Sequence, residues 1–226
     1  MQRYAVIVAG GKGVRMGEQT PKQFLLLRSR PILMHTLEAF FHHDPQIKII
    51  LVLPGNERGR WEKLCQEFGF SLPHLIAEGG SNRTQSVWQG LSAIEEDEGL
   101  VAVHDGVRPL VDRKIIQKSY EIASKKGNAI TGVALKDSIR WTDGSSNKAL
   151  ERNQYRLVQT PQTFNLRLLR EAYTSLGGKE MTDDASVFEY AGHSIHMIEG
   201  SYRNIKITTP EDLKIAEALW EEPLLL

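Results

Sequence analysis

Apolar positions along the chain follow two alternating patterns. Short continuous apolar runs predict buried strands at residues 4–9, 47–53, 75–78, 100–103 and 129–134, and shorter strands at 195–198 and 205–207. Between them, apolar residues at helical spacing predict helices at residues 31–43, 58–68, 82–94, 112–126, 166–175, 183–191 and 210–220. This alternation predicts an α/β fold, with a mostly parallel sheet and helices on both faces.

The segment from residue 136 to residue 158 departs from this pattern. It alternates only weakly, has no continuous apolar run, and contains Asp143-Gly144, a typical hairpin turn. We expect it to form a projecting β-hairpin arm within a single domain that comprises residues 1–226.

Composition narrows the classes of function. Lys and Arg number 28, as do Asp and Glu, so the net charge is zero, whereas non-specific nucleic-acid binders usually carry a basic excess. No segment approaches the roughly 20 apolar residues that span a bilayer, and the apolar run at 4–9 is too short for a signal peptide. The one cysteine, Cys65, excludes an intrachain disulfide and lies in a helical pattern that indicates packing. We therefore expect a cytoplasmic protein without membrane or nucleic-acid partners.

The first strand is followed by a loop that combines glycines with cations. Between residues 9 and 22 it contains Gly10, Gly11, Lys12, Gly13, Arg15, Gly17 and Lys22. Glycines let backbone N–H groups approach phosphate oxygens, and Lys and Arg side chains neutralise their charge. A plain strand-to-helix turn with solvated charges is the simpler alternative. The buried strand before the loop and the three cations in it favour a polyphosphate site.

Two familiar phosphate loops do not fit this segment. The chain has no Gly-x-x-x-x-Gly-Lys-Ser/Thr motif, which excludes a P-loop. In a dinucleotide fingerprint, Met16 would stand where the third glycine belongs, and the second strand ends at Leu53-Pro54-Gly55 without the expected acidic residue. A nicotinamide oxidoreductase is therefore disfavoured.

Two further strands end in loops that carry chemistry, and parallel strands bring such ends to one edge of a sheet. In the loop at residues 78–86, Gly80, Ser81 and the Ser86 hydroxyl are placed to contact a nucleotide base, although Ser81 also fits a helix N-cap. In the loop at residues 104–109, Asp105 suits Mg²⁺, which usually takes one or two carboxylates plus phosphate oxygens. Arg108 suits a second phosphate. We interpret His104 as structural.

Later positions are less specific. Arg152 and Thr160 are isolated polar residues, and Asp183-Asp184 fits a helix cap. Lys206 interrupts an apolar strand, so it needs an anionic partner if it is buried.

Together these motifs, in this order, resemble the 2-C-methyl-D-erythritol 4-phosphate cytidylyltransferases of the non-mevalonate isoprenoid route. The resemblance covers nearly the whole chain and rests on residues 9–16, Pro21-Lys22-Gln23-Phe24, Glu78-Gly79-Gly80 with Arg83 and Ser86, residues 104–109, Thr160-Pro161-Gln162, residues 182–186 and residues 204–208. It implies a Rossmann-like sheet, a CTP substrate, Mg²⁺ or another divalent cation, and a homodimer.

Site residues follow from the resemblance position by position. Arg15 and Lys22 match residues that stabilise the transition state at the α-phosphate. Cytidine recognition matches Ala9, Gly10, Gly11, Gly80, Ser81 and Ser86, with Arg83 in the same motif and Lys12, Gly13 and Gly106 in the neighbouring loops. Asp105 matches the carboxylate near the metal. The methylerythritol phosphate positions match Arg108, Ser138, Arg152, Thr160 and Lys206, of which Ser138 and Arg152 would serve the partner's site through an exchanged arm.

The resemblance implies an in-line displacement in which the substrate phosphate attacks the α-phosphorus of CTP and pyrophosphate leaves. A phosphate monoester is largely dianionic at neutral pH and needs no general base, which agrees with the lack of an obvious Ser-His-Asp set. A related subgroup makes CDP-ribitol from ribitol 5-phosphate and shares several motifs, but residues 182–189 and Leu150-Glu151-Arg152-Asn153 are more similar to the methylerythritol enzyme. A non-catalytic nucleotide-binding regulator is the more distant alternative.

Overall fold

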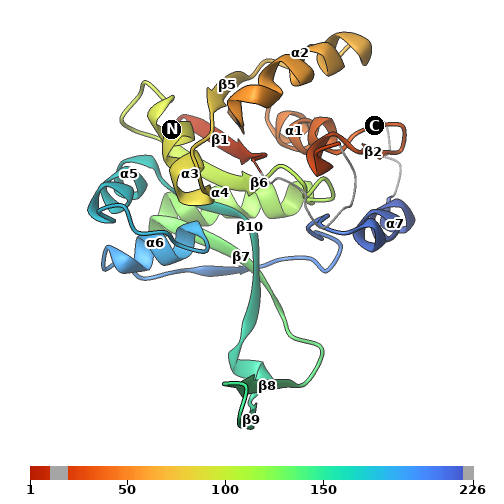
Figure 1. Ribbon diagram of the computed structural model, residues 1–226. Coiled ribbons are helices and arrows are strands. Elements are labelled where there is room, and N and C mark those ends of the chain that lie inside the picture. Colours follow the sequence, from red (N-terminus) through yellow and green to blue (C-terminus); the bar gives the residue numbers. More distant parts are fainter. Residues whose placement is uncertain (11–19, 221–226) are drawn as a thin grey trace.

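Seven strands form the central sheet in the order β11-β7-β10-β6-β1-β4-β5 (Figure 1). The structure is a computed structural model and describes residues 1–10 and 20–220. The strands are β1 (Arg3–Val8), β4 (Lys48–Leu53), β5 (Leu75–Glu78), β6 (Leu100–Asp105), β7 (Asn128–Ala134), β10 (Arg156–Asn165) and β11 (Met197–Glu199). Neighbours pair in parallel except β10, which is antiparallel to both β6 and β7. The predicted, mostly parallel α/β sheet is confirmed.

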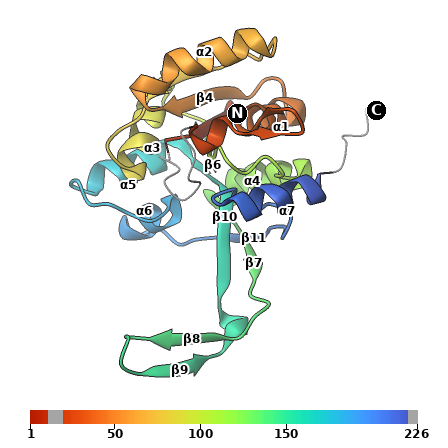
Figure 2. The same ribbon diagram turned by 45° about the vertical axis from the view of Figure 1, so that its right-hand side comes forward.

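Helices cover both faces of this sheet, as predicted (Figure 2). One face carries α1 (Ile32–His43), α2 (Arg58–Glu67) and α4 (Arg113–Lys126), and the other carries α3 (Arg83–Ser92), α5 (Leu166–Ser175) and α6 (Asp184–Tyr190). Successive strand side chains point to opposite faces, so in β1 Ala5 and Ile7 join the first core cluster while Tyr4 and Val6 join the second. This double burial explains why the strands are continuous apolar runs.

A third, smaller cluster lies beside the sheet. There α7 (Pro210–Leu219) packs against the hairpin of β2 (Leu26–Leu27) and β3 (Arg30–Pro31) and against Ile207. The short 3-10 helix η2 (Lys22–Phe24) leads into this hairpin, and η3 (Gly55–Glu57) precedes α2. None of the helices in the described part of the chain is long and apolar enough to cross a membrane.

The start of α3 differs from the prediction. Asn82, with extended backbone, is the N-cap, and its side-chain oxygen accepts a hydrogen bond from Gln85 N at 2.8 Å. The predicted cap, Ser81, is therefore wrong, because its hydroxyl instead donates to Gln85 Oε1 at 2.8 Å. The cap interpretation is confirmed for Asp183, which accepts from Ser186 N at the start of α6.

Two strand assignments near the site also differ. Residues 205–207 form no strand, although Ile207 N donates to Val107 O at 3.0 Å. Conversely, β10 runs through Thr160-Pro161-Gln162, where the pattern predicted no strand. Its polar side chains hid the pattern, since Gln162 and Thr163 are buried against hydrogen-bond partners that are distant in the sequence.

The hairpin arm extends away from the sheet at the far ends of β7 and β10 (Figure 1). Its strands β8 (Ile139–Thr142) and β9 (Asn147–Leu150) pair antiparallel around the predicted turn, where Asp143 Oδ1 accepts from the backbone N–H groups of Ser145 and Ser146. The 3-10 helix η4 (Arg152–Gln154) then leads back into β10. Most arm side chains are exposed, so the arm contributes little to the core of its own subunit.

Candidate active site

A pocket of about 260 Å³ lies at the carboxyl ends of β1, β5 and β6. Its walls include residues predicted from the three loops and one from later in the chain, namely Ala9, Gly10, Lys22, Gly80, Ser81, Arg83, Ser86, Asp105 and, last, Lys206. Val8, Gln23, Asn82 and Val107, which the sequence did not single out, complete the described lining. The predicted convergence of the loops is therefore observed at the edge of the sheet where parallel folds bind ligands.

The first loop enters the pocket directly from β1. Ala9 N donates to Val52 O at 3.0 Å, which continues the parallel pairing of β1 with β4 for one residue. A Cβ added at Gly10 would lie 3.9 Å from Ser86 Oγ, so the first and second loops face one another closely. Lys22 lies in η2 on the pocket wall. The predicted positions Gly11, Lys12, Gly13 and Arg15 lie outside the described residues.

The second loop is held by hydrogen bonds within itself. Gly80 N donates to Ser86 Oγ at 3.1 Å, and Ser81 N donates to Gln85 Oε1 at 3.0 Å. Ser86 Oγ in turn donates to Asn82 O at 2.8 Å. These two backbone N–H groups therefore already have acceptors within the loop.

The third loop forms a buried charge cluster around Asp105. This carboxylate ends β6 and is only 7% exposed. Arg108 Nε donates to its Oδ2 at 3.0 Å, and Lys206 Nζ lies 3.1 Å from the same oxygen. Burial raises the pKa of Asp105, but the charges of Lys206 and Arg108 outweigh this and hold the pKa below its usual value. Asp105 therefore stays ionised. Lys206 pairs with it although the lysine side chain is 41% exposed, so the burial on which the expected partner depended is not observed.

Two polar residues connect this cluster to β10. Thr160 Oγ1 accepts from Asp105 N at 3.1 Å, so the predicted substrate residue Thr160 contacts Asp105 but does not itself line the pocket. Asn204 is fully buried, donates from Nδ2 to Thr160 O at 2.8 Å, and accepts from Arg108 Nη1 on its carbonyl at 2.7 Å. Sequence analysis assigned no role to Asn204, although this residue begins one of the motifs that carry the family resemblance.

His104 and Gly106 support the cluster without entering the pocket. His104 is fully buried, donates from Nε2 to Arg108 O at 3.2 Å, and packs edge-on against Phe40. Burial lowers its pKa to about 4, so it is neutral at physiological pH and structural, as interpreted. At Gly106 a Cβ would lie 2.9 Å from that of Ala9, so glycine allows the ends of β6 and β1 to approach.

The structure does not bring Ser138 and Arg152 to this pocket. Both belong to the arm, where Arg152 donates from Nη1 to the carbonyl of Lys136. Neither residue lines the pocket of its own subunit, and Figure 1 shows the arm with β8 and β9 extending away from the sheet.

The carboxylate of Asp105 is the acidic group of the described pocket lining. Nowhere in residues 1–10 and 20–220 do three His, Cys, Asp or Glu side chains gather into a group that could hold a metal ion. Mg²⁺ commonly binds through one or two carboxylates plus substrate phosphates, so this donor set fits an ion that arrives with a polyphosphate.

Comparison with known proteins gives a consistent result. The family model described as 2-C-methyl-D-erythritol 4-phosphate cytidylyltransferase matches residues 4–222. Proteins of that name are 47% identical in Bacteroides thetaiotaomicron, over 97% of this chain and 100% of the relative, and 43% identical in Bacillus cytotoxicus, over 94% and 95%.

Solved structures agree with the sequence relatives. The crystal structure of 2-C-methyl-D-erythritol 4-phosphate cytidylyltransferase from Thermus thermophilus superposes with a TM-score of 0.79 at 32% identity, covering 97% of this chain and 98% of that one. The 4-diphosphocytidyl-2C-methyl-D-erythritol synthase from Anaerococcus prevotii gives 0.83 at 27% identity, covering 96% and 95%. Because fold, motifs and relatives agree along almost the entire length, the chain belongs to the 2-C-methyl-D-erythritol 4-phosphate cytidylyltransferase family.

Proposed function

We propose that the chain transfers CMP from CTP to 2-C-methyl-D-erythritol 4-phosphate in isoprenoid precursor biosynthesis. The products are 4-diphosphocytidyl-2-C-methyl-D-erythritol and pyrophosphate. The observation that carries the proposal is that Lys22 and Lys206, which are far apart in the sequence, line the same pocket as Gly10, Gly80 and Ser81. Family membership names the same activity.

The charges of the pocket suit a reaction between two anions. An oxygen of the substrate phosphate forms a bond to the α-phosphorus of CTP, the bond from that phosphorus to the bridging oxygen breaks, and pyrophosphate leaves with the electron pair. No proton has to be removed, because a phosphate monoester is already largely dianionic at neutral pH. Lys22 and Lys206 supply preorganised positive charge, and the resemblance adds Arg15.

We propose that Asp105 contributes to binding a divalent cation, most simply Mg²⁺, together with triphosphate oxygens. Such an ion would supply additional positive charge to the phosphoryl oxygens. Asp105 is suited to this because it remains ionised, and Arg108 and Lys206 both contact the same oxygen, Oδ2.

The second loop supports selection of cytosine. Its N–H groups at Gly80 and Ser81 donate to Ser86 and Gln85 within the loop, so we propose that backbone carbonyl oxygens read the base. Carbonyl oxygens accept from the exocyclic amino group of cytosine, whereas uracil presents another acceptor at that position. We therefore expect CTP to be preferred over UTP.

We further propose a homodimer in which each arm completes the partner's site. Ser138 and Arg152 match substrate-binding positions of the family, yet they lie outside the pocket of their own subunit. An arm that projects from the sheet and exposes most of its side chains is suited to reach a second copy of the chain.

A pyrophosphate-release assay tests the activity. The protein, with Mg²⁺, is given CTP or UTP and either methylerythritol phosphate or ribitol 5-phosphate. We expect the fastest release with CTP and methylerythritol phosphate. Faster release with ribitol 5-phosphate would assign the chain to the related reaction, and CTP binding without any release would favour a regulator.

A further inference from the structure

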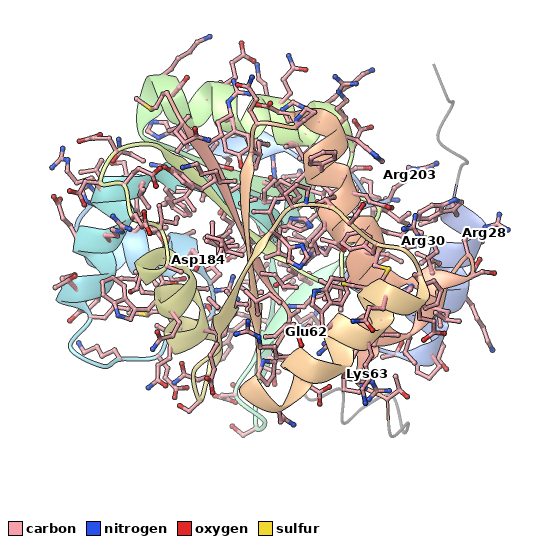
Figure 3. The ribbon with its side chains drawn as sticks, turned by 90° about the horizontal axis from the view of Figure 1, so that it is seen from above. Arg28, Arg30, Glu62, Lys63, Asp184 and Arg203 are labelled. Carbon is pink, nitrogen blue, oxygen red and sulfur yellow. The ribbon has the colours of Figure 1, made fainter. Side chains whose placement is uncertain are left out.

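Arg83 lines the pocket and forms an ion pair with a buried carboxylate, that of Asp184. It begins α3, and its guanidinium contacts Asp184 at the start of α6 through two hydrogen bonds, Nη1 to Oδ1 at 3.2 Å and Nη2 to Oδ2 at 2.6 Å. The Asp184 side chain is 0% exposed and that of Arg83 is 25% exposed. Figure 3 labels Asp184 on the side of the sheet that carries α3, α5 and α6. The pair therefore presents only its arginine to the pocket.

Three different elements hold Asp184 in place. The Tyr173 hydroxyl, on α5, donates to Asp184 Oδ1 at 2.6 Å. Burial and the charge of Asp184 raise the pKa of Tyr173 well above its usual value, so this donor keeps its proton. On β10, Gln162 Oε1 accepts from the backbone N–H groups of Asp184 and Ala185 at 3.0 and 2.8 Å. The carboxylate thus has one position, fixed from α3, α5 and β10.

The ion pair changes what Arg83 can recognise. Its two bonds to Asp184 use two of the five guanidinium donors, and among the described residues the other three N–H groups have no further hydrogen-bond partner. The adjacent carboxylate, bound through two hydrogen bonds, largely cancels its charge. Lys22 and Lys206 also line the pocket, and Lys206 is 41% exposed and shares its carboxylate, Asp105, with Arg108, so positive charge remains there. A neutralised, rigid fork of donors matches an uncharged acceptor better than it matches a phosphate.

We propose that Asp184 is a positioning residue for nucleotide recognition. Together with Tyr173 it orients and neutralises Arg83, whose remaining donors bind an uncharged acceptor of the nucleoside, a carbonyl or a hydroxyl. The polyphosphate is left to the lysines. This inference rests on the proposed function, because it assumes that a cytidine nucleotide occupies the pocket.

The variant Asp184→Asn separates the two parts of the ligand. Calorimetric titration with Mg²⁺ present compares the Kd of CTP with that of pyrophosphate, which has no nucleoside. We expect the Kd of CTP to rise about 10- to 100-fold, the range for losing a hydrogen bond that involves a charged group. The Kd of pyrophosphate should stay the same or fall, because the variant leaves Arg83 as an uncompensated cation. In turnover, the KM for CTP should rise with little change in the KM for methylerythritol phosphate.

A second variant covers the case in which Asp184→Asn does not fold. Tyr173→Phe retains the ion pair and removes one hydrogen bond, so the Kd of CTP should rise about 2- to 10-fold with no change for pyrophosphate. The matched control is Asp44→Asn, which breaks the 3.2 Å pair with Arg3 at the opposite end of the sheet and should alter neither Kd.

Two outcomes would overturn the inference. Equal weakening of CTP and pyrophosphate would show that Arg83 acts on phosphate, and unchanged Kd values for both ligands in both variants would show that the network is only structural. Failure of the proposed function is a separate observation, since it would appear as absent pyrophosphate release in the unsubstituted protein.

Discussion

Asp105 is the negative charge that holds together two cations, the pocket residue Lys206 and the neighbouring Arg108. Arg108 Nε and Lys206 Nζ lie 3.0 and 3.1 Å from its Oδ2. The substitution Asp105→Asn preserves the shape of the side chain and removes its charge. Arg108 and Lys206 are then left beside each other without their common counter-ion, so we predict a large loss of stability as well as of activity.

The magnitude follows from the exposure of the two cations. Removing one partner of a buried ion pair costs roughly 3–5 kcal/mol. The Arg108 side chain is only 11% exposed, so its charge stays largely out of contact with water, but it keeps its 2.7 Å hydrogen bond to the Asn204 carbonyl. Lys206 is 41% exposed and can turn toward water, where surface pairs contribute at most about 1 kcal/mol. We therefore expect a decrease in unfolding free energy of about 2–3 kcal/mol, mostly from Arg108.

Urea denaturation at neutral pH measures this loss. With an m-value of about 2–3 kcal/mol/M, the urea midpoint should fall by about 1 M. Fluorescence of the four tryptophans and circular dichroism should give the same midpoint if unfolding is two-state. A loss below about 0.5 kcal/mol, within the range of ordinary surface substitutions, would refute the reasoning.

The pH dependence gives an independent check on Asp105. Burial alone would raise its pKa, but Lys206 and Arg108 lower it below the unfolded value of about 3.9. A depressed folded pKa stabilises the native state above the unfolded pKa, and this contribution is lost as the pH falls through the folded pKa. The stability difference between the unsubstituted protein and Asp105→Asn should therefore be constant near neutrality and shrink in strong acid. A difference that grew with acidity would contradict this sign.

Four further predictions test other parts of the structure. Lys22→Ala should reduce kcat by roughly 10²–10³, as expected for one preorganised charge, and near-normal pyrophosphate release would exclude that role. Mixing inactive Lys22→Ala and Arg152→Ala subunits should restore activity if Arg152 serves the partner's site, and no recovery despite subunit exchange would count against it. Burial lowers the pKa of His104 from 6.5 to about 4, so the free energy of unfolding should decrease by roughly 3 kcal/mol as the pH falls from 6.5 to 4, and by less in His104→Gln. Gly90→Ala would place a Cβ 2.6 Å from a Val6 methyl group and should cost about 1–3 kcal/mol in urea denaturation, whereas Gly59→Ala, with nothing within 4 Å, should be neutral or stabilising.

The hydrophobic pattern predicted most of the elements to within two residues. Strands such as β4 and β6 are buried on both faces, which requires continuous apolar runs that are visible without any tertiary information. Helix ends were equally local, since Asp112 caps α4 and Gly127 ends it with a positive φ of 85°. Apolar runs and helix-end residues each lie within a short stretch of sequence, so one sequence is sufficient to detect them.

The errors occurred where buried polar groups find distant partners. On β10, Gln162 and Thr163 look like loop residues, yet they bind the start of α6 and Ser119 of α4. At residues 205–207, the apolar pattern suggested a strand, but Ile207 packs instead against α7 and its hairpin. Hydropathy cannot indicate such partners, because it records a residue's own polarity and not its neighbours.

For the candidate site, the same division holds. The sequence by itself determined that three strands end in loops that contain glycine, lysine, arginine or aspartate. It also predicted that these loops meet, because parallel strands bring such loops to one edge of a sheet. Only the tertiary structure decided which charges meet there: Lys206 with Asp105, across 101 residues of sequence, and Arg83 with Asp184, likewise. Charges of either pair would be solvated in an extended chain. The folded chain buries both carboxylates, Asp105 and Asp184, and brings each a specific cationic partner.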